Sequence, residues 1–584
     1  DHSELEVART AIERATAEPP DGASHHVGHW LISAGYRDLA AQLGYRPGPL
    51  ETLCGMADRR AGWLYATALI VATLAALVIP ATYLANLEVG WPIWALGFLL
   101  LLTPASILAI TLVNWVVTLT VSPRVLPKLD FRKGIPEDCA TVVVMPVLVS
   151  RSSEVGELLE RMEAHRITNP DPSLQFVLLT DGPDAPQERV PDDREIETAL
   201  VDGIGRLNLR YGSETGGPFH LFHRGRRYNT QQGCWMGWER KRGKLEQFNS
   251  FLLGDEVPDY VIREGETARL RGIRFVVTLD ADTRLQHETV QRLVGTLAHP
   301  LNKARFSAET GHVVAGYTVL QPRVEATPES SGRSMFARYY TGDTAIDIYS
   351  RAVSDVYQDL FGSGIFAGKG IYEVETFHRS LEGRIEENTV LSHDLLEGAL
   401  GRAGLISDIV LYETFPSGYL EHMRRWHRWV RGDWQLLPRL LGPSRSDARN
   451  GTARGLPILE RWKMLDNLRR SLLPVSLVAL ALAAWLVLPG NPWVWTLLTV
   501  LAPAAYIFTD IVSGLAKGRR RGAVRGVLHR TRDHAGRWLL AIVFLAQDAV
   551  VAVDAVGRTL WRTYVPRRNL LEWRTAAHVA MQVG

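Results

Sequence analysis

Two long runs without a charged residue limit what this chain can fold into. Residues 62–84 and 91–117 are almost entirely apolar, with Trp and Tyr near their ends. As helices, both runs are long enough to cross the hydrocarbon core of a bilayer, which is roughly 30 Å thick, and aromatic residues at the ends of a span are typical of the membrane interface. Neither run has a suitably placed cleavage site of small residues, and the first lies too deep in the chain for a signal peptide. We therefore predict a transmembrane hairpin.

Three more apolar stretches follow a long polar region. Residues 472–489 and 493–516 predict a second hairpin, so that the polar region would lie between two pairs of spans. The fifth stretch, residues 538–556, carries Asp548 and Asp554. Because acids are costly inside a bilayer, two interpretations stay open for it: an interfacial or re-entrant helix, or a true span whose acids line a cavity.

Basic residues indicate how the spans are oriented. Lys and Arg close to a span resist translocation, so the ends that they flank stay on the cytoplasmic side. They occur before the first and third spans and after the second and fourth, as Arg59 and Arg60, Arg469 and Arg470, Arg124 and Lys128, and a cluster at 517–530. The polar region between the hairpins is therefore expected in the cytoplasm.

Length and composition leave room for several domains beside the membrane helices. The chain has 584 residues, of which 46% are hydrophobic and 22% charged, and this is compatible with large packed cores. Its three cysteines, Cys54, Cys139 and Cys234, are scattered, which argues against a disulfide framework and a zinc site and fits a reducing compartment. The first residue is Asp, and the last residues stop inside a helical pattern, so we expect a segment of a longer polypeptide.

The polar region from about 138 to 411 alternates short apolar strands with helical patterns. Such alternation predicts an α/β sheet with parallel strands, whose ligands bind outside the carboxyl ends of the strands. The expected strands are 141–149, 174–180, 219–223, 273–279 and 314–322, and helical patterns include 154–165 and 243–253. Polar residues that follow these strands are therefore the first candidates for a site.

Acidic residues follow two of the strands. Asp181 comes directly after residues 174–180, where its carboxylate could bind a ribose or a nucleobase, or where Asp-Gly-Pro could simply form a turn. Asp280 and Asp282 follow the strand at 273–279, and two like charges so close together suggest a cation between them. Oxygen ligands suit Mg²⁺ or Mn²⁺. The alternative is an N-cap, because a helical pattern begins at Asp282.

Two further features lie downstream. Asp394, in "SHDLLEG", opens another helical pattern and could serve either as a general base toward a hydroxyl or as an N-cap. Residues 423–440 are basic, aromatic and amphipathic, which suits a helix on the membrane surface. The same stretch could bind a sugar diphosphate, because indole faces stack on pyranose rings and guanidinium groups bind phosphate oxygens. Interfacial anchoring alone is the simpler alternative.

Taken together, these residues resemble a known series. Asp181, Asp280-x-Asp282, Asp394 and Arg428-Trp429 look like the D, DxD, D, QxxRW series of processive, inverting family-2-like glycosyltransferases. Longer segments are similar to the glycosyltransferase region of bacterial cyclic β-1,2-glucan synthases (family-84 type), and the similarity covers nearly the whole chain. They are residues 25–39, 126–136, 169–181, 233–249, 361–375, 392–398 and 427–435.

The resemblance implies a membrane protein in which a GT-A-like α/β glycosyltransferase domain lies between transmembrane helices. The implied segments are a cytoplasmic helical segment at 1–60, a transmembrane hairpin at 61–120, the GT-A-like domain at 121–418, interfacial amphipathic helices at 419–470, and transmembrane and interfacial helices at 471–584. The implied location is the inner membrane of a bacterium, with several spans and a cytoplasmic catalytic domain.

The resemblance also implies a role for each site residue. Asp394 would be the catalytic base, and Asp280 and Asp282 would hold Mg²⁺ or Mn²⁺. Nucleotide contacts would come from Asp181, Lys244, Asp280 and Arg428, with Asn249 in a matching position, and acceptor contacts from Trp429, Gly364 and Lys369, with Gly362 in the same loop. Arg425 stands where other processive synthases have Gln, and at this position the chain departs from the series.

The implied reaction is inverting, processive transfer of glucose from UDP-glucose to a growing β-1,2-glucan, as in cyclic β-glucan synthesis. The expected partners are this donor, the glucan acceptor, the lipid bilayer and further C-terminal domains of a longer protein, but no nucleic acid. Tyr564 is a conceivable primer for the glucan. Two alternatives stay open: a linear polysaccharide synthase that uses another sugar nucleotide, and a transporter with a nucleotide-binding regulatory domain.

Overall fold

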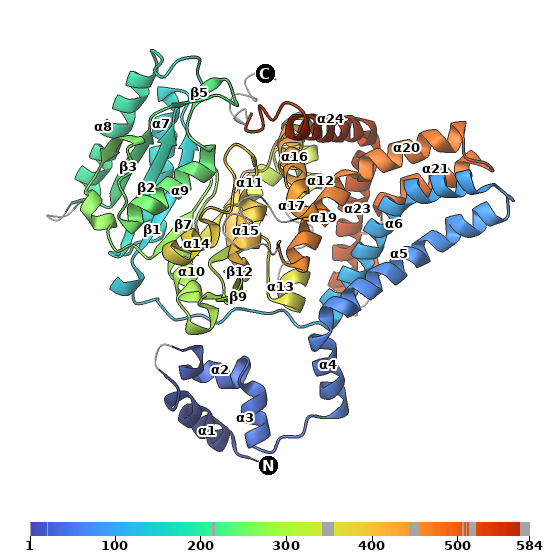
Figure 1. Ribbon diagram of the computed structural model, residues 1–584, viewed down its shortest axis with the longest axis horizontal. Helices are drawn as coiled ribbons and strands as arrows, with labels where there is room; N and C mark the ends of the chain where they lie inside the picture. The colour runs from blue at the N-terminus through green and yellow to red at the C-terminus, as the bar shows by residue number, and fades with distance from the viewer. Residues whose placement is uncertain are drawn as a thin grey trace.

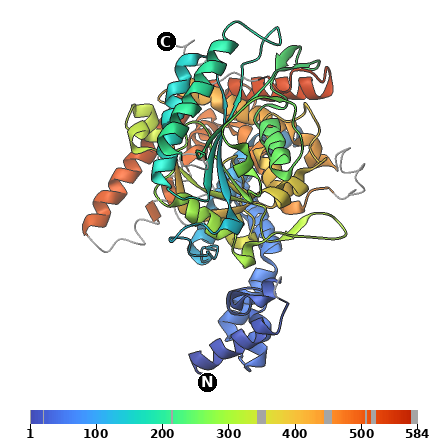
Figure 2. The same cartoon turned by 90° about the vertical axis from the view of Figure 1, so that its left-hand side faces the viewer.

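The computed structural model describes residues 2–19, 22–212, 216–341, 355–442, 455–504, 507–509, 511–512 and 521–572. A mixed sheet with covering helices forms one side of the molecule, and apolar helices extend from the other (Figure 1). A small group of helices at the N-terminus lies below the sheet and the apolar helices in this view, and the turned view shows the same arrangement (Figure 2).

The N-terminal helices lead into a long apolar hairpin. They are α1 (Glu4–Thr16), α2 (Val27–Ile32), α3 (Tyr36–Gln42) and α4 (Pro49–Arg59), and the first three share a small core around Trp30 and Leu39. The hairpin consists of α5 (Ala61–Ala85) and α6 (Trp91–Thr120). Within the described residues, these are the two unbroken helices that are long and apolar enough to cross a membrane, as the sequence predicts.

The second predicted hairpin takes a different form. The described apolar segments are α20 (Leu473–Leu486) and α21 (Pro492–Leu501), which are each shorter than the ~20 residues a span requires. α20 continues α19 (Ile458–Ser471) across a bend of 42°, where Pro474 cannot supply the N–H that a straight helix would use. Part of the predicted fourth span, residues 493–516, lies outside the described residues. A count of four spans therefore requires that each bent pair be one span.

The fifth apolar stretch forms the other bent pair, α23 (Arg521–Val543) and α24 (Leu545–Tyr564), with an angle of 61° between them. α24 packs along α16 (Tyr419–Gln435). Asp548 accepts a hydrogen bond from the Tyr419 hydroxyl, and Asp554 pairs with His427 at 2.9 Å, so both acids bind side chains of α16. The bend is compatible with a broken span as well as with a re-entrant helix, so both interpretations of this stretch stay open.

The sheet of the polar region has eight strands in the order β12-β10-β11-β7-β1-β2-β3-β6. Their bounds are β1 (Thr141–Leu148), β2 (Leu174–Asp181), β3 (Phe219–Arg224), β6 (Tyr260–Glu264), β7 (Phe275–Thr278), β10 (Val319–Ala326), β11 (Gly370–Glu373) and β12 (Gly404–Glu413). β7, β1, β2 and β3 are parallel, as are β10 and β12. β6 and β11 run antiparallel to their neighbours, so the prediction of an all-parallel sheet is wrong: the sheet is mixed.

Each face of the sheet has its own core. α7 (Val155–Thr168), α8 (Asp193–Tyr211) and α10 (Thr289–Leu297) cover one face, and α9 (Arg240–Leu253) and α14 (Val374–Leu381) cover the other. Two short hairpins accompany the sheet, β4 (Arg227–Asn229) with β5 (Cys234–Met236), and β8 (Arg305–Phe306) with β9 (Val313–Ala315). The single strand predicted at 314–322 is therefore β9 and β10, separated at Gly316, whose positive φ of 65° ends the extended run.

The remaining helices pack around the edge of the sheet that carries β12. They are α11 (Pro328–Ser331), α12 (Met335–Thr341), α13 (Val356–Phe361), α15 (Asp394–Gly401), α16 and α17 (Leu437–Leu441). Leu395 and Leu396 of α15 are buried in one core with Leu436 and with Met464 of α19. This core fixes α15, which carries Asp394, relative to the helices that lead into the apolar segment.

Candidate active site

The mixed sheet brings distant residues to one edge. The parallel strands β1, β2 and β7 all end there, and Asp280 follows β7 directly. β11 is antiparallel to β7, with Gly370 opposite Thr278, so the start of β11 and the preceding Lys369 meet the end of β7. β12 runs in the same direction as β7 and ends with Glu413 at this edge. Three strands thus place Asp280, Lys369 and Glu413 together.

Two lysines bind Asp280. Lys241, on the first turn of α9, approaches Oδ1 of Asp280 at 2.6 Å, and Lys369 approaches Oδ2 at 3.3 Å. Lys369 also forms an ion pair with Glu413. Burial opposes the charge of each group, but the two lysines still hold the pKa of Asp280 well below its ordinary value, and Glu413 with Asp280 raises the pKa of Lys369. Asp280, Lys241 and Lys369 are therefore charged near neutral pH.

Asp280, Asp282 and Glu413 form a set of oxygen donors. One carboxylate oxygen from each lies within 4.8 Å of the others, and Glu413 is further held by a hydrogen bond of 2.8 Å from the Thr283 hydroxyl. Carboxylate oxygens at this spacing fit a hard divalent cation. α10 begins only at Thr289, so Asp282 does not cap it and the N-cap alternative is wrong for this residue.

Asp394 faces the same edge from α15. It is the first residue of the helix, so the N-cap is His393, which makes no side-chain capping hydrogen bond, and the N-cap alternative is wrong for Asp394. Gly368, the residue before Lys369, lies directly against it: a Cβ on Gly368 would come within 2.4 Å of Asp394 Oδ1, and the φ of this glycine is +81°. The carbonyl of Gly368 accepts a hydrogen bond of 3.0 Å from Lys241. Lys241 thereby links the loop under Asp394 to Asp280.

Arg428, on α16, interacts electrostatically with the acids at this edge of the sheet. Burial and the charge of Arg425 lower the pKa of Arg428, while Asp280, Asp394 and Asp282 act in the opposite direction. Arg428 is therefore within the electrostatic reach of all three acids. Trp429 follows it on the helix and is 40% exposed, which leaves part of its indole open to a ligand.

Asp181 lies at the end of β2 in a buried ion-pair cluster. Arg224, opposite it on β3, binds both carboxylate oxygens at 2.7 and 2.8 Å, and Lys244 approaches at 3.0 Å. Burial opposes ionisation, yet these cations lower the pKa of Asp181 to about 2, and burial lowers the pKa of Lys244 to about 8. Gly237 covers the carboxylate, because a Cβ there would come within 2.7 Å of Oδ2. The carboxylate makes ion pairs rather than the hydrogen bonds of a simple turn, and the nucleotide contacts of Asp181 and Lys244 stay predictions.

Two residues of the resemblance lie within packed structure. Gly364 donates its N–H to Ala403 at 2.8 Å, its carbonyl accepts from Lys463 at 2.8 Å, and a Cβ on it would meet the backbone of Leu405. Asn249 is buried and accepts a hydrogen bond of 2.8 Å from Tyr372. Neither is among the charged groups described above, so an acceptor contact by Gly364 stays a prediction.

Sequence reasoning missed three residues of the two clusters. Lys241 precedes Lys244 by one helical turn in "RKRGK", a signal that could have been used. Glu413 ends the apolar strand 404–413 as Asp181 and Asp280 follow theirs, and this signal was also available. Arg224 ends β3 opposite Asp181, but only the register of the two strands reveals the pair.

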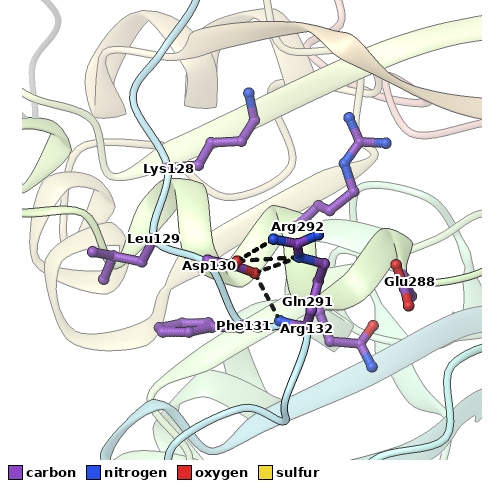
Figure 3. Close-up of a pocket in the computed structure, with 8 residues that line it drawn as sticks. All are labelled: Lys128, Leu129, Asp130, Phe131, Arg132, Glu288, Gln291 and Arg292. Atoms are coloured by element: carbon purple, nitrogen blue, oxygen red, sulfur yellow. Dashed lines mark hydrogen bonds and ion pairs between the residues drawn. The ribbon is translucent and has the colours of Figure 1, made fainter.

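A separate cavity of about 270 Å³ lies between α10 and the segment that precedes β1 (Figure 3). It is lined by Lys128, Leu129, Asp130, Phe131, Arg132, Glu288, Gln291 and Arg292. Lys128 and Arg292 pair with Asp408, and Arg132 pairs with Asp130. None of the predicted site residues lines this cavity, so it contributes nothing to the site.

Comparison with known families and proteins finds similarity in the region of this site. Residues 275–508 match the family described as glycosyl transferase family group 2, which includes the region of Asp280, Asp394 and Arg428. The chain is 39% identical over 592 residues to the cyclic beta-(1,2)-glucan synthase NdvB of Rhizobium meliloti (strain 1021). This confirms the resemblance that the motifs predict. The alignment covers 99% of this chain and 20% of NdvB, so the chain spans about a fifth of the length of that relative.

A solved structure also matches the chain. It is the mannosyltransferase PcManGT from Pyrobaculum calidifontis in complex with GDP-Man and Mn²⁺. The match covers 80% of this chain and 98% of that one, at 16% identity and a TM-score of 0.39.

Proposed function

We propose that this chain transfers glucose from UDP-glucose to a growing β-1,2-glucan, with inversion at the anomeric carbon and without release between steps. The observation that carries the proposal is a cluster of charges at one edge of the sheet, in which Lys241 and Lys369 bind Asp280, and Asp394 and Arg428 lie within electrostatic reach of the cluster. The 39% identity to a cyclic β-1,2-glucan synthase supports the choice of donor and linkage.

The residues suit an inverting displacement. Asp394 would take the proton of the acceptor hydroxyl as its oxygen attacks the anomeric carbon, and the bond from that carbon to the diphosphate oxygen would break with its electron pair on UDP. One displacement inverts the configuration, so an α-linked donor gives a β-linked product. Lys241, Lys369 and Arg428 would offset the negative charge of the leaving diphosphate, which is the electrostatic demand of the reaction.

Asp280, Asp282 and Glu413 would hold Mg²⁺ or Mn²⁺, because their oxygens are close enough to share one ion. When bound, the cation would act as a Lewis acid toward the diphosphate oxygens. Lys241 and Lys369 pair with Asp280 and would therefore compete with the cation for its carboxylate.

The other contacts complete the proposal. Trp429, partly exposed beside Arg428, would stack on a sugar ring of the acceptor. Asp181 and Lys244 would support the nucleotide side of the site from the neighbouring strand end, and Gly364 the acceptor side. A GT-A-like domain facing the cytoplasm of a bacterial inner membrane, joined to further C-terminal domains, is part of the same proposal; α5 and α6 support the membrane attachment.

The alternatives have less support. Another sugar nucleotide would use the same acids, so the donor rests on the identity to NdvB. Asp548 and Asp554, the residues that suggest a transporter, bind Tyr419 and His427 of α16. The linear polysaccharide synthase is therefore the second candidate, ahead of the transporter.

The test uses purified membranes with UDP-glucose and Mg²⁺ or Mn²⁺. We expect release of UDP, and we expect Asp394→Asn to abolish release while UDP still binds, because the variant keeps its shape but loses the base. Continued turnover of this variant would remove Asp394 as the base. If the unaltered chain released no UDP from any sugar nucleotide, the proposed function itself would be wrong.

A further inference from the structure

A buried histidine stands beside the proposed base. His393 is 5% exposed, and its Nε2 lies 3.5 Å from Oδ1 of Asp394 and 3.9 Å from Oε1 of Glu397. Neither Nε2 nor Asp394 Oδ1 has a hydrogen-bond partner among the residues that the structure describes. Buried polar atoms without partners cost free energy, and such a group at an active site suggests a function.

The local fold holds the ring between the two carboxylates. His393 caps α15 with a helical backbone conformation, and Glu397 donates its N–H to the carbonyl of His393 at 2.9 Å. Residues four apart lie on the same face of a helix, so Glu397 must face the imidazole. Leu395 and Leu396 are buried in one core with Leu436 and with Met464 of α19, which packs α15 against these residues.

The other charged groups near Asp394 and Glu397 have partners of their own. Burial and the charge of Asp394 raise the pKa of Glu397, whereas His393, Arg242 and Lys241 act to lower it. Lys241 is bound by Asp280, and Arg242 is bound by Glu239 at 2.7 Å and by Glu246 at 2.6 Å. Arg428, on α16, lies within electrostatic reach of Asp394. The nitrogen that lies between the two carboxylates is Nε2 of His393.

We propose that His393 is a positioning residue for the catalytic base: its Nε2–H donates to Asp394 and separates that carboxylate from Glu397. A shift of less than 1 Å closes the distance to a normal hydrogen bond, and apo sites often tighten only when the substrate binds. The proposal rests on the proposed function, in which Asp394 takes the proton of the acceptor hydroxyl. No proton transfer through His393 is required.

The proposal predicts opposite shifts for two substitutions. His393→Phe leaves carboxylate oxygens of Asp394 and Glu397 within 4.8 Å of each other without a donor between them, so the repulsion between the two carboxylates increases. The acidic midpoint of the pH profile of kcat should move up by about one unit, with at least about a tenfold loss of kcat below it. Glu397→Gln removes the competing charge and should move the midpoint down. His393→Gln keeps an N–H donor and should restore most of the loss.

The experiment measures UDP release from UDP-glucose between pH 4.5 and 9 with the full chain in detergent. UDP binding at pH 7 verifies that each variant is folded, and His378→Phe, on the neighbouring α14, serves as the matched control and should leave the profile unchanged. Shifts of the acidic midpoint in opposite directions in His393→Phe and Glu397→Gln support the proposal. Shifts in the same direction, or no shift, overturn it, as does a zinc ion bound to the unaltered protein and lost equally in His393→Phe and His393→Gln.

These outcomes are separate from those of the proposed function. If Asp394→Asn keeps full turnover, Asp394 is not the base and the proposed function fails first. If Asp394→Asn is inactive but His393→Phe leaves the profile unchanged, the base stands and only the positioning role of His393 is overturned. Should His393→Phe fail to fold, Glu397→Gln and His393→Gln still decide, because the former must lower the midpoint and the latter must not raise it by more than a few tenths of a unit.

Discussion

Replacement of Lys369 by Met should tighten metal binding while it slows turnover. Lys369 lies 3.3 Å from Asp280 and also pairs with Glu413, so it holds two of the three carboxylates that would bind the cation. Without the lysine, the three acids repel one another with less compensation, and a divalent cation relieves that repulsion. The loss of a positive charge near the diphosphate should nevertheless lower the rate.

The size of the expected change in metal affinity follows from the distance between Lys369 and Asp280 and from the exposure of the Asp280 side chain. Two unit charges 3.3 Å apart interact by about 5 kcal/mol at an effective dielectric constant of about 20. The side chain of Asp280 is 35% exposed, and solvent screening reduces such interactions strongly. We take about 1.4 kcal/mol as what remains, which corresponds to a tenfold lower Kd for the metal ion.

The assay is titration of the purified protein with Mn²⁺ in the absence of nucleotide, with free Mn²⁺ followed by its paramagnetic resonance signal. Lys303→Met, at an exposed lysine outside the site, is the matched control and should leave the Kd unchanged. Lys241→Met should act in the same direction as Lys369→Met, because Lys241 binds the other oxygen of Asp280. A Kd that is unchanged or higher in Lys369→Met would refute the assignment of these acids as the metal ligands.

Three further predictions concern the acceptor, the buried ion pair and the pH dependence of stability. Trp429→Ala should shorten the product through lost stacking, which sizing of radiolabelled glucan would reveal; normal product length and rate would contradict it. Asp181→Asn leaves Arg224 and Lys244 buried without their counter-charge and should lower the free energy of unfolding by about 3 kcal/mol, visible as a lower Tm; an unchanged Tm would contradict it. Burial, with a smaller contribution from the charge of a neighbouring arginine, lowers the pKa of His165 to about 4, so its contribution to stability is complete above about pH 6.5 and is lost as the pH falls to about 4. His165→Gln should flatten this part of the Tm profile, and an equally steep fall would exclude His165 as its source.

Much of the fold can be predicted from local patterns. The strands that end at Asp181 and before Asp280 are short apolar runs, and the helical pattern around Lys244 is equally clear, so β2, β7 and α9 occur where expected. The apolar hairpin of α5 and α6 is visible for the same reason, since each run is continuous and uncharged. In all these cases the signal lies within one segment of the chain.

Strand direction and pairing could not be predicted in this way. β11 has only four residues, Gly370–Glu373, and nothing in them shows that the strand runs antiparallel between β7 and β10. That direction is what brings Lys369 to Asp280. Likewise, Arg224 and Asp181 become partners only through the register of β3 with β2, in which they are directly opposite.

The ends of helices are also difficult to predict from local patterns. The pattern from Asp282 onward looks helical, but α10 begins at Thr289, because the intervening residues form the loop that carries Asp282 and Thr283 to Glu413. The stretch 472–489 predicts one span, but α20 ends at Leu486 and bends by 42° away from α19 near Pro474, which hydropathy alone does not show. In both places a contact with another part of the chain, or the backbone chemistry of a single residue, outweighs the average pattern.

The central claim is that this chain builds β-1,2-linked glucose by a single displacement at the anomeric carbon. Linkage and anomer analysis of the polymer made from radiolabelled UDP-glucose by the purified chain tests it most directly. We predict 2-linked glucose in the β configuration, with no polymer from Asp394→Asn. A product with α linkages, or one joined through another hydroxyl, would contradict the account.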